Sequence, residues 1–204
     1  MCSPQKTDNQ THKLILASSS PYRAELLNRL GTPFTTQSPN IDETPQQDET
    51  PQALALRLSI EKAAVIAKAN PSSWVIGSDQ VAELNGNILH KPGNIENARH
   101  QLKASSGKTV NFYTGLCLSH YEKGVTQHCI VPFSVNFLSL NNELIDSYLS
   151  KEKPFNCAGS FKIEGLGITL FHSMKGDDYT SLIGLPMMAL CKLLRNVGIE
   201  PLSM

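Results

Sequence analysis

The sequence has no long uncharged apolar run, no paired cysteines and no excess of charge of either sign. Its longest stretch without Asp, Glu, Lys or Arg spans residues 124–142, where polar residues and a proline interrupt it, so it cannot cross a membrane. The 204 residues contain 18 Lys and Arg against 18 Asp and Glu, a balance that excludes a basic nucleic-acid coat. A local basic pocket remains possible, because a small anion needs only a few cations in one place.

The five cysteines are widely scattered, and none lies in a CxxC pair or at metal-binding spacing from a histidine. They are Cys2, Cys117, Cys129, Cys157 and Cys191. This pattern argues against structural zinc and a disulfide framework, and it predicts free, mostly buried thiols in a cytoplasmic protein. Residues 1–12 are polar and lack the apolar core of a signal peptide, so we expect a flexible tail there.

Strand and helix patterns alternate along the chain and predict an α/β fold with a mixed sheet, in a single domain over residues 13–204. The predicted strands are 14–17, 74–78, 81–84, 88–89, 109–118, 126–137 and 167–171. The predicted helices are 21–31, 51–69, 94–105, 141–149 and 185–195. Repeats and linkers rich in Pro, Gly or Ser, which would indicate further domains, are absent.

Three serines and an arginine surround the start of the predicted first helix. Ser18, Ser19 and Ser20 precede it, and serine hydroxyls together with free backbone N–H groups can bind an anion. Arg23 falls in the first turn, where the helix dipole disfavours a cation unless an anion lies nearby. The segment predicts a phosphate site, but simple capping by the serines with Arg23 in solvent fits the same residues.

Two lysines could supply further positive charge. Lys62 emerges beside the apolar stripe of helix 51–69, where a lysine either reaches along the surface to water or binds a buried anion. That stripe consists of Leu54, Leu58, Val65 and Ile66. Lys91 follows the predicted strand 88–89, and Pro92 restricts it to an extended conformation. Taken singly, each lysine is compatible with an ordinary surface position.

Two carboxylates could balance these cations. Asp79 directly follows the predicted strand 74–78, the place where open α/β sheets put ligand-binding groups, and Glu43 lies in the irregular segment 38–50. Two carboxylates and phosphate oxygens suit a Mg²⁺ or Mn²⁺ ion that keeps several waters. The sequence lacks a P-loop, a GxGxxG dinucleotide motif and a GxSxG elbow, which argues against a kinase, a Rossmann oxidoreductase and a lipase-type hydrolase.

These segments, in this order and spacing, resemble the Maf nucleotide pyrophosphatases along nearly the whole chain from Lys13 onwards. The matching motifs are Leu14–Pro21 with Arg23, Asp42–Thr44, Glu61–Ala63, Gly77–Asp79, Lys91–Pro92, Tyr113–Gly115, Ala158–Ser160 and Gly184–Pro186. The resemblance implies an ITPase-like fold with two lobes flanking a central cleft, and commonly a homodimer. It also implies metal-dependent hydrolysis of a nucleoside triphosphate to a monophosphate and pyrophosphate.

The same resemblance assigns a role to each candidate residue. Asp79 would be the proton acceptor that activates water for attack at the α-phosphorus. Glu43 and Asp79 would hold the divalent metal, Mg²⁺ or Mn²⁺. The triphosphate would be bound by Ser18, Arg23, Lys62 and Lys91.

Three further positions separate subfamilies. Pyrimidine-specific members typically carry Arg, Thr and Gln where this chain has Tyr22, Gln80 and Glu164, a set that resembles the 7-methyl-GTP subfamily. Methylation at N7 makes guanine cationic, so the Tyr22 ring could stack on it by cation–π attraction while Glu164 supplies opposite charge. The subfamily often has Trp at position 22, and Tyr offers a smaller stacking surface.

The leading hypothesis is a cytoplasmic hydrolase that converts 7-methyl-GTP to 7-methyl-GMP and diphosphate, acting on neither nucleic-acid polymers nor membranes. One alternative keeps the chemistry and changes the base, giving a house-cleaning enzyme for dTTP, UTP or other modified nucleotides. A second alternative is a non-catalytic, nucleotide-binding regulator of septum formation. The presence of Glu43, Lys62, Asp79 and Lys91 together argues against loss of catalysis.

Overall fold

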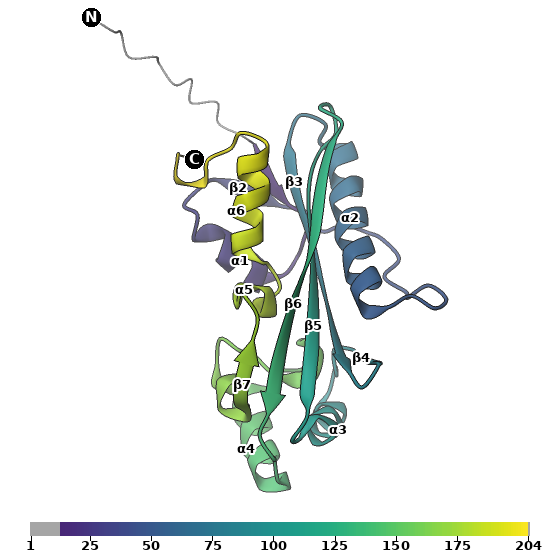
Figure 1. Cartoon of the computed structure of the whole chain (residues 1–204), viewed down its shortest axis with the longest axis vertical. Helices are drawn as coiled ribbons and strands as arrows, with labels where there is room; N and C mark the ends of the chain where they lie inside the picture. Colours follow the sequence, from purple (N-terminus) through teal and green to yellow (C-terminus); the bar gives the residue numbers. More distant parts are fainter. Residues whose placement is uncertain (1–12, 204) are drawn as a thin grey trace, which may run out of the picture.

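A seven-stranded mixed sheet runs along the length of the molecule (Figure 1). The computed structural model describes residues 13–203 of the chain. The strands are β1 (Leu14–Leu16), β2 (Phe34–Thr36), β3 (Trp74–Leu84), β4 (Asn87–Leu89), β5 (Thr109–His120), β6 (Val125–Phe137) and β7 (Phe171–Lys175). Their order is β2-β1-β3-β5-β6-β7, with β4 also paired to β3. β1 lies parallel to β2 and β3, and the remaining pairs are antiparallel.

Helices cover both faces of this sheet. They are α1 (Pro21–Asn28), α2 (Pro51–Ala69), α3 (Ile95–Ser105), α4 (Asn142–Glu152), α5 (Thr180–Ile183) and α6 (Met187–Asn196), with short 3₁₀ turns at Ala158–Ser160, Leu166–Leu170 and Pro201–Ser203. α2 lies on one face, against β3 and β5, and α6 lies on the other face. The predicted α/β class with a mixed sheet is therefore confirmed.

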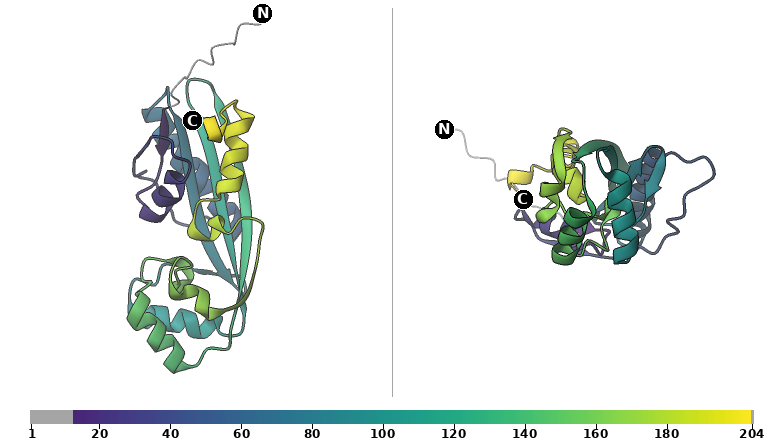
Figure 2. Two further views of the ribbon diagram at one scale, coloured as in Figure 1. Left: turned by 90° about the vertical axis from the view of Figure 1, so that its left-hand side faces the viewer. Right: turned by 90° about the horizontal axis from the view of Figure 1, so that it is seen from below.

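The molecule has two lobes joined by the long strands (Figure 2). One lobe contains β1, β2, α1 and α6, and its apolar core gathers Leu16, Leu26, Ile76 and Leu190. The other lobe contains α3 and α4 beside the far ends of β5 and β6. Its core is centred on aromatic rings that pack edge to face, including Phe112, Phe137, Phe161 and Phe171.

Local sequence explains where the first two helices begin. The Ser20 hydroxyl accepts a hydrogen bond from the backbone N–H of Arg23, and the Thr50 hydroxyl accepts one from that of Ala53. Each cap is followed by a proline at the first helical position, where the missing N–H costs nothing. Both starting points agree with the sequence prediction.

Two glycines let α2 lie directly on the sheet. A Cβ atom at Gly77 of β3 would stand 2.1 Å from the carbonyl oxygen of Ser59, and one at Gly115 of β5 would stand 2.2 Å from that of Ala55. Real side chains do not approach backbone so closely, so only glycine permits this packing. The contact brings the α2 backbone against the middle of β3, and with it the Lys62 side chain.

Some of the predicted elements were wrong. β3 does not end before Asp79 but continues to Leu84, because β5 pairs with it throughout and Lys62 balances the charge of Asp79. The predicted strand 167–171 is a 3₁₀ turn, and β7 begins only at Phe171, since Gly167 folds back so that its N–H donates to the Lys162 carbonyl. Sequence reasoning also missed β2 and α5, which are short.

Burial corrects two smaller predictions. Val65, expected in the apolar stripe of α2, is 44% exposed, whereas Ile66 is buried. The four cysteines within the described range are free as expected, but only Cys117 is fully buried, and Cys129, Cys157 and Cys191 are partly buried. Cys2 and the predicted tail at residues 1–12 lie outside the described residues. No helix within residues 13–203 has the length and apolarity needed to cross a membrane.

We expect Gly77→Ala to lower the free energy of unfolding by about 1–3 kcal/mol, because the new methyl group forces α2 away from β3. Urea denaturation monitored by circular dichroism measures this. Gly124→Asn is the control, because Gly124 lies in an open turn with a positive φ that Asn tolerates. We expect this variant to change the free energy of unfolding by less than about 0.5 kcal/mol. Equal stability of Gly77→Ala and the unaltered protein would show that α2 does not depend on this contact.

Candidate active site

A cavity of about 780 Å³ opens between the two lobes. Its walls come from the loop after β1, the segment before α2, the α2 face, the middle of β3, the end of β4, and residues 156–164 and 182–184. Every side chain predicted for the site lines this cavity, namely Ser18, Tyr22, Arg23, Glu43, Lys62, Asp79, Gln80, Lys91 and Glu164. Residues far apart in the sequence thus meet at one place, while their individual roles stay predictions.

The alternation of β3 divides its residues between two walls. Gly77 and Asp79 face α2, whereas Ser78 and Gln80 face α5 on the other side. Asp79 is therefore placed against Lys62 by the same strand face that admits α2. The strand delivers a charged group to one wall and a polar amide to the other.

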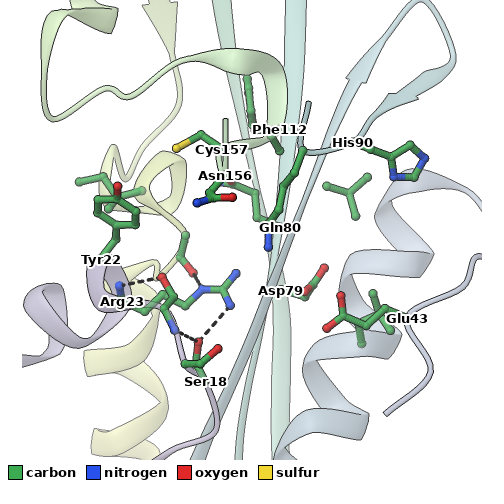
Figure 3. Close-up of a pocket in the computed structure, with 18 of the residues that line it drawn as sticks. Ser18, Tyr22, Arg23, Glu43, Asp79, Gln80, His90, Phe112, Asn156 and Cys157 are labelled. Atoms are coloured by element: carbon green, nitrogen blue, oxygen red, sulfur yellow. Dashed lines mark hydrogen bonds between the residues drawn. The ribbon is translucent and has the colours of Figure 1, made fainter. Parts of the chain in front are cut away.

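Lys62 joins the two predicted metal-binding carboxylates. Its Nζ lies 2.6 Å from Oε1 of Glu43 and 2.5 Å from Oδ1 of Asp79. The side chains of Lys62 and Asp79 are only 8% and 12% exposed, while that of Glu43 is 58% exposed. Lys62 therefore does not extend to water but pairs with two acids inside the cavity, both of which are labelled in Figure 3.

Burial opposes ionisation of Glu43, but the hydrogen bond from Lys62 and the charges of Lys62, Lys91 and Arg23 outweigh it. The pKa of Glu43 consequently lies below its usual value, and the carboxylate is ionised at neutral pH. An ionised carboxylate is the form that a divalent cation binds.

Arg23 lies across the cavity from these acids (Figure 3). Its Nε donates to the carbonyl oxygen of Gly184 at 2.7 Å, and Nη1 donates to the Ser18 hydroxyl at 3.4 Å. Burial lowers the pKa of Arg23, and the charges of Asp79 and Glu43 partly offset this, yet a guanidinium remains protonated. The structure thus holds a desolvated cation next to the serine loop, an arrangement suited to a phosphate oxygen.

The side-chain amide of Gln80 is held in place by the hydrogen bonds that its NH₂ group donates. Its Nε2 donates to the carbonyl oxygens of Ser181 at 2.7 Å and Leu182 at 3.0 Å, with the Thr114 hydroxyl oxygen at 3.3 Å. These bonds use the N–H groups, so the amide oxygen is the part of Gln80 left to accept a hydrogen bond from a ligand.

Sequence reasoning missed the residue that anchors α5. The buried carboxylate of Asp178 accepts hydrogen bonds from the backbone N–H groups of Thr180 at 3.0 Å and Met188 at 2.8 Å, which ties α5 to the start of α6. The carbonyl oxygens of α5 then hold Gln80, and Gly184 at its end holds Arg23. An Asp two residues before a Thr is an Asx-turn signal that could have indicated this cap.

Two other residues at the cavity were not predicted. Asn156 and Cys157 lie beyond Gln80, at the end of the cavity away from Ser18 and Asp79 (Figure 3). Burial raises the pKa of the Cys157 thiol, so this group is neutral at physiological pH. Charged side chains lie near this thiol as well, since Lys162, Glu164 and Lys91 also act on its pKa.

The donor set limits which metal could bind here. Among the described residues, no group of three or more His, Cys, Asp or Glu side chains is arranged to hold an ion. The carboxylate oxygens of Glu43 and Asp79 both contact the Lys62 ammonium and so lie close together. Two such oxygens fit a Mg²⁺ or Mn²⁺ ion whose other ligands are water and phosphate oxygens. This donor set does not fit a structural zinc site.

A solved structure shares this architecture at low sequence identity. The Staphylococcus aureus Ham1 protein superposes with a TM-score of 0.52 and 15% identity, over 91% of this chain and 99% of that one. A likeness of this kind shows the fold alone, and it agrees with the expected ITPase-like architecture.

Closer relatives are found by sequence. A protein of Nitrosococcus oceani named 7-methyl-GTP pyrophosphatase is 52% identical over 91% of this chain and 93% of its own length. A protein of the same name from Colwellia psychrerythraea is 50% identical over 93% of this chain and 95% of its own. The family described as Maf-like protein matches residues 13–197. The chain belongs to the Maf family.

Proposed function

We propose that this protein hydrolyses 7-methyl-GTP to 7-methyl-GMP and diphosphate. The observation that carries the proposal is the cavity itself, in which cations and two acids gather at one end and Tyr22 and Glu164 line the same space. Relatives of about 50% identity over nearly the full chain are named for this activity. The reaction breaks the bond between the α-phosphorus and the bridging oxygen to the β-phosphate.

The triphosphate is bound at the charged end. Arg23 and Ser18, already in contact with each other, meet phosphate oxygens from one side, and Lys62 and Lys91 meet them from the other. Positive charge held in place before the reaction stabilises the charge that grows on the departing diphosphate. Arg23 is oriented by Gly184, so its remaining N–H groups are free to bind phosphate.

Asp79 accepts the proton of the attacking water. Its carboxylate is buried at 12% exposure, is fixed by Lys62 and faces the cavity, so a water beside it would be oriented toward the α-phosphorus. A bound Mg²⁺ or Mn²⁺ would withdraw electron density from the phosphate oxygens, with Glu43 and Asp79 as its protein ligands.

The base is recognised through its positive charge. The ring of Tyr22 stacks on the methylated guanine, and Glu164, which lines the same cavity, supplies a negative charge. Gln80 accepts a hydrogen bond from the base, since its amide nitrogen is held by α5.

We further propose a single domain over residues 13–204 that acts as a homodimer in the cytoplasm, on the strength of the family resemblance.

A panel of common nucleoside triphosphates and 7-methyl-GTP, assayed with Mg²⁺ and then Mn²⁺, tests the reaction. We expect diphosphate rather than orthophosphate as the product, released chiefly from 7-methyl-GTP. Release of orthophosphate would contradict cleavage next to the α-phosphorus. Preference for dTTP or UTP would contradict the assignment of the base, and binding without turnover would favour a regulatory role.

Asp79→Asn should lower kcat by roughly 10²–10⁴-fold, because the amide cannot take a proton from water. KM for the nucleotide should change little if the phosphate cations stay in place. Asp146→Asn, an exposed acid paired with Arg99 outside the cavity, is the matched control and should leave kcat unchanged. Turnover of Asp79→Asn close to that of the control would remove Asp79 from the proposed role.

Exchange of the three base-contacting residues for those typical of pyrimidine-specific members tests selectivity. In the variant Tyr22→Arg, Gln80→Thr, Glu164→Gln, we expect the ratio of kcat/KM for 7-methyl-GTP over UTP to fall roughly tenfold or more, since an attractive ring is replaced by a like charge. Parallel kinetics with both substrates measure the ratio. An unchanged ratio would show that these residues do not read the base.

A further inference from the structure

The segment that carries Glu43 has no helix or strand of its own. β2 ends at Thr36 and α2 begins at Pro51, and residues 38–49 between them form turns and irregular backbone. Its internal bonds are short-range, such as that from the Thr44 N–H to Asp42 Oδ1 at 2.9 Å. Such bonds shape the segment locally but do not fix it to the sheet or to α2.

One guanidinium connects this segment to α2. Arg57 of α2 donates from Nε to Glu49 Oε1 at 2.7 Å and from Nη2 to Glu49 Oε2 at 2.8 Å. Nη2 also donates to the carbonyl oxygen of Thr44 at 3.1 Å, and Nη1 lies 3.2 Å from Oε2 of Glu61 on the next turn. Thr44 directly follows Glu43, so Arg57 is hydrogen-bonded to the backbone next to that acid.

The geometry makes this a stronger contact than an ordinary surface ion pair. Arg57 and Glu49 are only 18% and 8% exposed at their side chains, and the two parallel N–H···O bonds match the fork of a guanidinium. Within the described part of the chain, the hydrogen bonds and ion pairs from residues 38–49 to other elements involve only Arg57 and Lys62.

We propose that Arg57 is a positioning residue that holds Glu43 where it can bind the divalent metal. Arg57 is not among the residues that line the cavity, so it acts through the backbone of Thr44 and not on the substrate. Without it, Glu43 would be held by Lys62, which shares its charge with Asp79, and by the packing of Ile41 two residues earlier against the apolar face of α2. The inference rests on the proposed function, because it takes Glu43 as a metal ligand.

Titration with Mn²⁺ tests this role in the full-length protein. The free ion is measured by electron paramagnetic resonance, with a non-hydrolysable α,β-methylene analogue of the best triphosphate present. We expect Arg57→Met to weaken Mn²⁺ binding roughly 10- to 100-fold, as is typical when a residue that orients a metal ligand is lost. Activity at saturating Mn²⁺ should show a nucleotide KM within about threefold of normal, since the phosphate-binding cations are untouched.

Arg99→Met is the matched control, because Arg99 also pairs with an acid, Asp146, but on α3 and α4 away from the cavity. Its Mn²⁺ affinity should be unchanged. Arg57→Lys should recover only part of the affinity, because an ammonium cannot form the two parallel bonds to Glu49. Thermal melting shows whether each variant folds, and Glu49→Gln replaces Arg57→Met if the latter does not.

Three outcomes would overturn the inference, and they are distinguishable. If Glu43→Gln weakens Mn²⁺ binding while neither Arg57→Met nor Glu49→Gln does, Glu43 is a ligand but Arg57 does not position it. If Glu43→Gln also binds Mn²⁺ normally, the metal assignment in the proposed function fails and the role of Arg57 fails with it. Equal loss of affinity in Arg99→Met would show a general effect of removing an arginine.

Discussion

The arrangement of charged side chains in the cavity depends on the buried ammonium group of Lys62. This group pairs with Asp79 from the sheet and with Glu43 from an irregular segment, so three separate parts of the chain meet at one atom. Removing one partner from a buried ion pair typically costs about 3–5 kcal/mol, because the remaining charge is left without compensation. The packing of α2 on β3, which sets the position of Lys62, therefore also sets the electrostatics of the site.

The two faces of β3 separate charged from neutral polar groups in the cavity. Asp79 points to the α2 side, where cations and acids are close together, and Gln80 points to the α5 side, where backbone carbonyl groups hold it. Gly184 at the end of α5 meanwhile orients Arg23 toward the same space. A strand that alternates between two walls can thus place neighbouring residues in two different environments of one cavity.

Much of this arrangement could be predicted from sequence because it depends on local signals. The caps Ser20 and Thr50, each followed by proline, indicated where two helices begin, and the collinear motifs indicated which side chains would gather. The extent of β3 could not be predicted, since Asp79 interrupts an apolar pattern and only Lys62, 17 positions earlier, explains why it is tolerated. The role of Asp178 was missed because α5 is too short to show a helical period, and only the Asx-turn signal of an Asp two residues before a Thr could have indicated it.

The absence of side chains at Gly77 and Gly115 has a mechanical consequence. Because the α2 backbone rests on β3 and β5 without intervening atoms, the helix cannot slide or tilt without a clash or a void. Lys62 and Asp79 therefore belong to a rigid wall. The segment 38–49, which has no helix or strand, and the glycine-containing stretch 156–164 form other parts of the cavity lining. We expect any change of shape that lets a nucleotide enter or diphosphate leave to occur in these two segments, because the wall formed by α2 and β3 has no room to move.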